Sequence, residues 1–187
     1  METLVKSIEQ IGGLKVDAKG ILQHFHREEI AKGELLIREG QTARKMYFVE
    51  NGILRTFYYD KDKEVTSWFY VEKQFVSSWH SFYAQSPSFE NIETLEDCTL
   101  YSISYADYQE LLNTDASFGV FGRKLAEKFI VALDYFSKSY QFLTAREKYN
   151  LILDTFPEID QRVSLGLIAS IMGASRETLS RIRAGKL

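Results

Sequence analysis

Residues 165–182 read LGLIASIMGASRETLSRI. Apolar residues recur at intervals of three and four on both sides of Gly173, which predicts two short helices joined at that glycine. Ala169 offers a small side chain where two steeply crossed helices touch, and glycine accepts the positive φ that a tight turn needs. Leu179 and Ile182, three residues apart, would hold the second helix against the first. This spacing is typical of a helix-turn-helix.

The free face of the second helix is polar. Ser175 stands where an N-cap is expected, and its hydroxyl can accept a backbone N–H. The other side chains of this face are Arg176, Glu177, Ser180 and Arg181. Arginine can donate two hydrogen bonds to guanine and glutamate can accept one from cytosine, so these five residues are our candidate contacts to double-stranded DNA. The alternative is a surface hairpin in which Glu177 and Arg181 form only an exposed i,i+4 ion pair.

Charge is distributed unevenly along the chain. The 187 residues carry a formal net charge of −3. Residues 161–187 nevertheless hold four arginines and one lysine against Glu177 alone, so this segment carries +4 and the remainder −7. A basic segment on an otherwise acidic chain would attract DNA phosphates to the expected helix-turn-helix. Arg162 is one of the five basic residues of this segment.

Composition excludes several classes of protein. A hydrophobic share of 45% can build a core, and a single cysteine, Cys98, excludes an internal disulfide and an all-cysteine metal site. No apolar run approaches the roughly 18 residues that span a bilayer, and the first residues lack a signal-peptide core, so we expect a cytoplasmic protein without a membrane partner. No nucleophile–base spacing, glycine-rich phosphate loop or metal-ligand cluster stands out, so we expect neither an enzyme nor a metal site.

Three kinds of segment follow one another. Residues 1–30 show a loose helical period. Short β-rich runs follow at 34–38, 45–50, 53–60, 64–71, 91–97 and 98–104, with a polar turn at 60–63. Short strands at this spacing predict a sandwich, roll or barrel. Helical periods then return at 105–112, 117–143 and 144–156, and Thr144 with Glu147 forms a candidate capping box.

The long helix expected at 117–143 carries two apolar stripes. The second, beside the first, consists of Ala126, Ile130 and Leu133. One stripe would cover the chain's own β domain, so two stripes favour a homodimer through this helix; the alternative is a helix buried wholly within one subunit. To the dimer contact we assign residues of the first stripe, namely Phe121, Leu125, Phe129, Ala132 and Phe136.

In this order of elements the chain resembles the Crp/Fnr family of transcription regulators. Residues 32–52, KGELLIREGQTARKMYFVENG, are similar to the opening strands and glycine turns of the cyclic-nucleotide-binding roll. Residues 175–181, SRETLSR, are similar to the start of the family's recognition helix. In the family, the residues matching Arg176, Glu177 and Arg181 contact base edges, and the one matching Ser175 contacts phosphate.

The resemblance implies an α+β fold. It consists of an N-terminal jelly-roll-like β-roll of the cyclic-nucleotide-binding type, a long dimerisation helix and a C-terminal helix-turn-helix. We place a sensor domain at 1–115, the dimerisation helix at 116–143 and the DNA-binding domain at 144–187. The expected function is a sequence-specific DNA-binding transcriptional regulator that responds to a small effector, and RNA polymerase is an implied partner. The alternative is a ligand-sensing or interaction module with weak or no DNA binding.

The expected effector pocket departs from the family. Members that bind cyclic AMP carry Gly-Glu-Leu and then Arg-Ser/Ala, whereas this chain has Ser77-Ser78-Trp79 and Phe89-Glu90, with no Lys or Arg between positions 73 and 123. Burying a phosphate without a cation is costly, so we expect no tight cyclic AMP binding. Our candidates for a non-standard pocket are Ser77, Ser78, Trp79, His80, Phe89 and Glu90. Heme is not expected, because His80 has no identifiable second axial partner.

Overall fold

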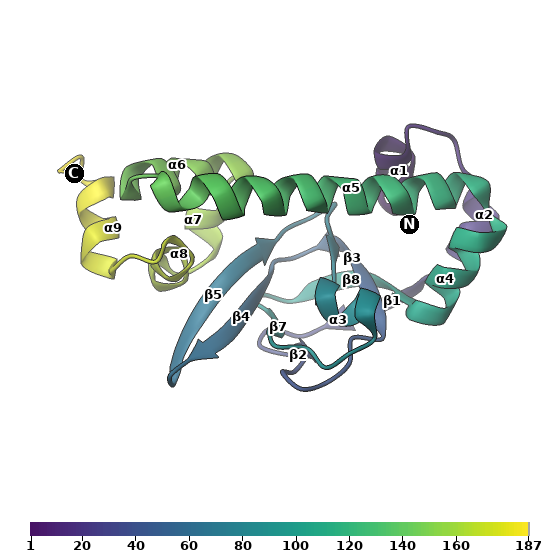
Figure 1. The fold of residues 1–187 in the computed structure, drawn as a ribbon, viewed down its shortest axis with the longest axis horizontal. Coiled ribbons are helices and arrows are strands. Elements are labelled where there is room, and N and C mark those ends of the chain that lie inside the picture. Colours follow the sequence, from purple (N-terminus) through teal and green to yellow (C-terminus); the bar gives the residue numbers. More distant parts are fainter. Residues whose placement is uncertain (187) are drawn as a thin grey trace.

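Two antiparallel sheets form the centre of the molecule (Figure 1). The computed structural model describes residues 1–186, except for the side chain at position 139. One sheet has the strand order β1-β8-β3-β6 and the other β2-β7-β4-β5. The strands are β1 (His26–Ile30), β2 (Leu35–Ile37), β3 (Lys45–Asn51), β4 (Leu54–Asp60), β5 (Lys63–Tyr70), β6 (Phe75–Val76), β7 (Asn91–Thr94) and β8 (Cys98–Ser104). The chain changes sheet at nearly every connection, as in a jelly roll, so the expected β-roll is confirmed.

A long helix, α5 (Ala116–Ser139), runs along most of the length of the molecule above the roll (Figure 1). Beside the roll lie α1 (Glu2–Gly12), α2 (Ala18–Leu22), α3 (Trp79–Ala84) and α4 (Tyr105–Thr114). After α5 and the turn η1 (Tyr140–Phe142) come α6 (Ala145–Thr155), α7 (Ile159–Arg162), α8 (Leu165–Met172) and α9 (Arg176–Arg183). The capping box of Thr144 and Glu147 is confirmed at the start of α6. Within residues 1–186 no helix is both long and apolar enough to cross a bilayer.

The N-terminal region is only partly helical. Gly13 ends α1 with φ 71° and donates its N–H to the carbonyl of Glu9. The expectation of helix up to residue 30 is wrong, because residues 26–30 are β1 and pair with β8. This edge strand is only shallowly buried and polar, so its sequence shows no apolar alternation that would reveal it. The short elements β6 and α7 were likewise too brief for a periodic signal.

Two apolar cores hold the fold together. The first fills the roll and extends to α1, α4 and the first half of α5. The second joins α6, α8 and α9 to Ile53 and Phe69, which lie on the outer side of the β4–β5 sheet. The helix-turn-helix therefore packs directly on the roll. The domain limits at 115/116 and 143/144 stay predictions.

Candidate nucleic-acid interface

The α8–turn–α9 unit has the geometry that the sequence predicts. Gly173 adopts φ 65°, and Ala174 donates its N–H to the carbonyl of Ala169 at 2.9 Å, which closes the turn. Ile168 and Ala169 are buried on α8, and Leu179 and Ile182 are buried on α9. The apolar anchors thus fix the second helix on the first and leave its opposite side exposed.

Ser175 caps α9. Its Oγ accepts the backbone N–H of Thr178 at 3.1 Å, so one of the free donors at the helix start is satisfied. A hydrogen bond with Ser175 and the charges of Arg176 and Arg181 lower the pKa of Glu177. Glu177 is therefore ionised at neutral pH and acts only as a hydrogen-bond acceptor.

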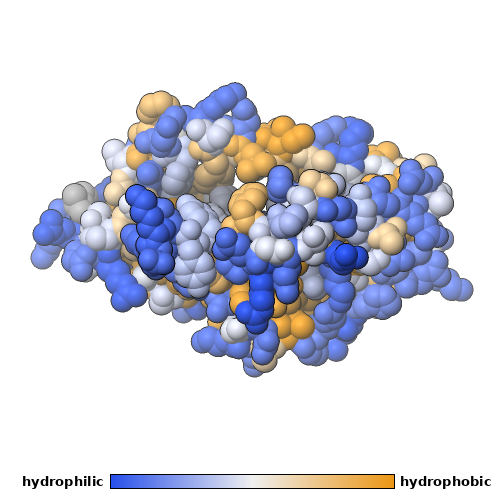
Figure 2. Space-filling model, turned by 60° about the horizontal axis from the view of Figure 1, so that its bottom comes forward, coloured by the Kyte–Doolittle hydropathy of each residue, from blue (hydrophilic) through white to orange (hydrophobic). Residues whose placement is uncertain are grey.

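The outer face of α9 is exposed, and its charged residues form no ion pair with one another. Ser175, Arg176, Glu177, Ser180 and Arg181 all lie on the surface. Among the described residues no ion pair joins Glu177 to Arg181, although they are four residues apart, and none engages Arg176. Hydrophilic residues cover most of this end of the molecule, at the left of Figure 2. The two guanidinium groups are thus free to meet a ligand.

Arg176 also has a neighbour that sequence analysis missed. Its guanidinium lies over the first turn of α8, where a Cβ on Gly166 would come within 2.4–2.8 Å of three guanidinium atoms. The absence of a side chain at Gly166 makes room for Arg176. The only sequence signal was a glycine inside an apolar helix, which often marks a close approach.

Comparisons with known proteins agree with this architecture. Residues 27–115 match the cyclic nucleotide-binding domain family. A solved protein assigned to the Crp/Fnr family, from Eubacterium rectale, aligns with a TM-score of 0.67 at 18% identity, over 89% of this chain and 80% of its own. The chain has the Crp/Fnr fold.

Two further solved structures share this Crp/Fnr fold. The c-di-GMP-responsive global regulator CLP of Xanthomonas campestris aligns with a TM-score of 0.65 at 22% identity, over 89% of this chain and 88% of its own. A CooA mutant from Carboxydothermus hydrogenoformans aligns with a TM-score of 0.72 at 17% identity, over 99% of this chain and 84% of its own. No curated protein matches the sequence. At these identities the likeness shows the fold alone.

Arg162 does not belong to the exposed basic surface. Its guanidinium donates to Glu72 Oε1 at 2.7 Å and also pairs with Glu96, and both carboxylates lie on the roll. Although partial burial opposes the effect, the hydrogen bonds that Glu72 accepts from Arg162 and from the backbone N–H of Gly52, together with the charge of Arg162, lower its pKa to about 2. The charge of Arg162 is therefore used in ion pairs between the roll and α7, the short helix before the helix-turn-helix, and Arg183 of the same basic segment lies 3.9 Å from Asp160. A second link is the Thr66 N–H, which donates to Ser170 Oγ on α8 at 2.9 Å.

The serines of the expected effector pocket are buried and already hydrogen-bonded. Ser77 Oγ donates to the carbonyl of Lys45 at 2.9 Å, and Ser88 Oγ donates to Ser78 Oγ at 2.9 Å. Burial raises the pKa of Glu90, which a hydrogen bond with Ser78 partly offsets. Ser78 and Glu90 thus belong to an internal polar cluster around Ser88, and Ser77 is bonded separately to the β3 backbone.

The other three residues of that pocket point elsewhere. Trp79 Nε1 donates to Tyr70 Oη at 3.1 Å, and its ring packs 4.1 Å from that of Phe129 on α5. His80 and Phe89 are exposed, with ring centroids 5.4 Å apart. The structure does not gather these six residues around one cavity, because the serines and Trp79 are used for internal packing, and an effector pocket here stays a prediction.

The expected dimer contacts also need correction. Phe121 and Leu125 are buried in the roll core, Phe129 contacts Trp79, and Phe136 lies 4.7 Å from the ring of Trp68. Ala132 is half-buried on the same stripe. This stripe meets the chain's own roll because its aromatic rings fill the groove beside the roll's aromatic residues. The second stripe is the free one, since Ile130 and Leu133 are 65% and 67% exposed.

The structure also brings together potential metal ligands that sequence analysis missed. Ligand atoms of His24, Asp107 and Glu110 lie within 4.8 Å of one another, from segments 83 residues apart. His24 Nδ1 lies 3.3 Å from Asp107 Oδ1, and Ser104 also hydrogen-bonds to Asp107 as the cap of α4. Hydrogen bonds account for the positions of His24 and Asp107, and the expectation of no metal site stays a prediction.

Proposed function

We propose that the chain is a dimeric, sequence-specific DNA-binding transcriptional regulator. The observation that carries the proposal is the outer face of α9, where Arg176, Glu177 and Arg181 are exposed on a helix anchored by Leu179 and Ile182. Two bidentate donors and one ionised acceptor match the donor and acceptor pattern of base pairs in a major groove. In this function Ser175 and Ser180 contact the phosphate backbone beside them.

The dimer would form through the second stripe of α5. Ala126, Ile130 and Leu133 are spaced four and three residues apart, as in the seam of a coiled coil. Two large apolar side chains exposed side by side on one helix favour a partner that covers them. A twofold pairing of α5 would present two copies of α9 to two half-sites of one operator.

The roll would influence DNA binding through its contact with α8. Thr66 and Glu72 of the roll bind Ser170 on α8 and Arg162 on α7. A shift of β5 and of the turn after it would therefore move the helix-turn-helix. An effector would act by favouring one of two arrangements of this contact. RNA polymerase is the partner that such a regulator would recruit or block.

DNA binding is tested with an operator selected from random duplexes. Replacement of Arg181 by Ala should weaken binding to that operator by roughly 1–3 kcal/mol, about 5- to 150-fold, because one bidentate base contact is lost. The exposed Arg38 of the roll is the matched control, and Arg38→Ala should bind as the wild type does. Fluorescence anisotropy measures all three proteins.

A salt titration on random duplex separates this proposal from its alternative. Binding that neutralises phosphates should weaken with a slope of about −0.9 per contact in log K against log salt. A flat response, or equal binding by Arg181→Ala and wild type, would favour an interaction module without a DNA function.

A further inference from the structure

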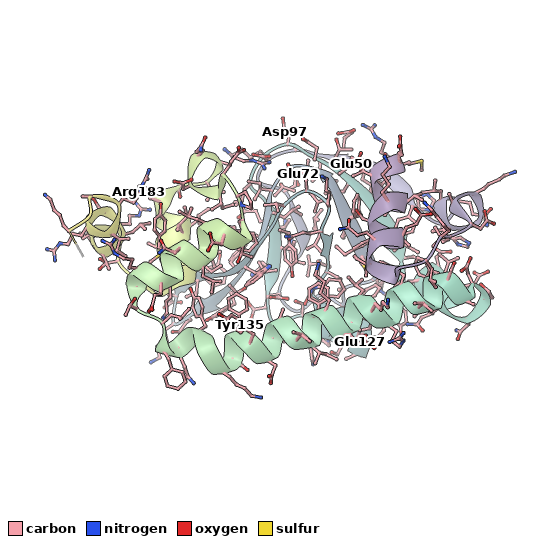
Figure 3. All side chains as sticks on the ribbon, turned by 90° about the horizontal axis from the view of Figure 1, so that it is seen from above. Glu50, Glu72, Asp97, Glu127, Tyr135 and Arg183 are labelled. Atoms are coloured by element: carbon pink, nitrogen blue, oxygen red, sulfur yellow. The ribbon has the colours of Figure 1, made fainter. Side chains whose placement is uncertain are left out.

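A basic cleft lies between the N-terminal helix and the long helix. Its volume is about 550 Å³, and it is bounded by α1, by α5 and by the turn between β5 and β6. Lys124 and Lys128 line it from α5, Lys73 from the turn, and Ser7 from α1. Glu127, labelled in Figure 3, belongs to the stretch of α5 beside α1. The cleft is separate from the serine cluster of the roll described above.

The positive charge in this cleft is not compensated. Within residues 1–186, none of the three ammonium groups has an ion pair or hydrogen bond, and the one acidic residue that lines the cleft, Glu127, pairs with Arg123 instead. Four lysines elsewhere in the described part of the chain form ion pairs, for example Lys15 with Glu9 and Lys45 with Glu28, whereas Lys32 does not. Three free cations around one concavity form a site for an anion of high charge.

Lys73 occupies a backbone conformation that favours glycine. Its φ is 67°, and its N–H donates to the carbonyl of Val49 at 2.8 Å, which fixes the turn. A lysine is strained in this conformation, whereas a glycine would adopt it freely. The turn therefore holds a third ammonium group at the cleft at some expense of backbone strain.

We propose that this cleft binds a small molecule that carries two or more phosphate groups. Lysine is a compact, strongly hydrated point charge that suits phosphate oxygens, and three of them match the charge of a diphosphate or triphosphate. The Ser7 hydroxyl and the Gln10 amide offer further donors, while Ile11 and Val131 can cover an organic part of the ligand. The volume lies within the ordinary range of small-molecule sites.

The site is compatible with a dimer through α5. Lys128 is two residues before Ile130, which places it about 160° away around the helix. A partner helix on Ile130 and Leu133 would leave the cleft side of α5 uncovered. A bound polyphosphate would link α1, the β5–β6 turn and α5, so it would stiffen the start of the helix that leads to the helix-turn-helix.

Isothermal titration calorimetry of the full chain with inorganic pyrophosphate and tripolyphosphate tests the proposal. We expect binding of one polyphosphate per chain, tighter for tripolyphosphate than for pyrophosphate. The double variant Lys124→Met with Lys128→Met should weaken binding by about tenfold or more, because two charge-assisted contacts are lost. Lys32→Met removes one exposed charge outside the cleft and should leave binding unchanged.

Lys73→Gly separates ligand binding from folding. Because glycine relieves the backbone strain, the thermal midpoint without ligand should stay equal or rise, while polyphosphate binding weakens. Arg181→Ala should bind polyphosphate as the wild type does, so the cleft can be tested whether or not the chain binds DNA.

Three results would overturn the proposal. They are the absence of heat with either polyphosphate at millimolar concentration, equal binding by the double variant and wild type, and an equal loss in Lys32→Met. A loss of duplex DNA binding, rather than of polyphosphate binding, in the double variant would also reject it and assign the lysines to DNA.

Discussion

Arg176 depends on the missing side chain of Gly166. A Cβ at position 166 would lie 2.4 Å from the nearest guanidinium nitrogen, so Gly166→Ala must displace the far end of a flexible side chain. Fold stability should hardly change, because alanine is a better helix former than glycine. We expect weaker operator binding, by up to the roughly 1–3 kcal/mol of a lost bidentate contact.

Anisotropy measurements on Gly166→Ala and Arg176→Ala check this dependence. If Arg176→Ala loses affinity while Gly166→Ala does not, the position of Arg176 over α8 has no part in DNA binding.

The ion pair of Arg162 with Glu72 should make the contact between the roll and α7, the helix before the helix-turn-helix, dependent on pH. The folded state holds the pKa of Glu72 at about 2, below its ordinary value of 4.5. A carboxyl with a lowered pKa contributes stability that is present above its ordinary pKa and is lost as the pH falls toward the folded value. We therefore expect the thermal midpoint to decline between about pH 5 and pH 2, and Glu72→Gln to remove part of that decline.

Thermal unfolding followed through tryptophan fluorescence reports on this contact, because Trp68 lies between α5 and α6 and contacts Phe136 and Phe156. The exposed Glu39→Gln is the matched control and should keep the wild-type pH profile. An identical profile for Glu72→Gln would show that the ion pair contributes nothing.

Local signals at single residues were readable from the sequence. Gly173 at the turn, Ser175 at the N-cap and the Thr144–Glu147 capping box involve partners within five residues, so spacing alone predicts them. The ion pairs of Arg162 join residues 66 and 90 positions apart, and no local pattern encodes them. Arg162 therefore looked like one more exposed basic residue.

At the scale of elements, α5 shows that the periodicity of a sequence predicts the apolar faces of a helix but not the surfaces that these faces contact. The two apolar stripes were visible in the sequence, but their partners were not. The aromatic stripe packs on the roll through Phe121 and Phe129, because large rings fill the groove beside Phe75 and Trp79. The smaller aliphatic stripe stays exposed at Ile130 and Leu133, and it is the proposed dimer contact.

Two single substitutions on α5, one inside the proposed dimer contact and one outside it, test the proposed dimer. Leu133 and Val131 are 67% and 69% exposed, so either position accepts Asp without disturbing the fold. Leu133→Asp would place a carboxylate in the proposed dimer contact, so this variant should be a monomer. Position 131 lies outside that contact, so the Val131→Asp variant should remain a dimer.

Sedimentation velocity distinguishes these outcomes. A monomeric wild-type chain, or equal dissociation by both variants, would contradict a dimer through Ala126, Ile130 and Leu133.

At the scale of the whole molecule, the order of roll, long helix and helix-turn-helix was predictable, whereas the contact between its ends was not. The hairpin of β4 and β5 reaches toward α8, and the second core includes residues of both (Figure 1). This packing combines strands before residue 72 with helices after residue 144, and sequence periodicity carries no information on such docking. The arrangement makes the roll a direct neighbour of the proposed DNA-binding unit.

Selection of operators from random duplex DNA with the full chain tests the proposed function most directly. A dimer that presents two copies of α9 should enrich an inverted repeat whose half-sites are one helical turn, about 10–10.5 base pairs, or a multiple of it apart. Enrichment of such a repeat, lost with Arg181→Ala, is the predicted result. Repeated selection without any enriched sequence would contradict the proposal that this chain reads DNA.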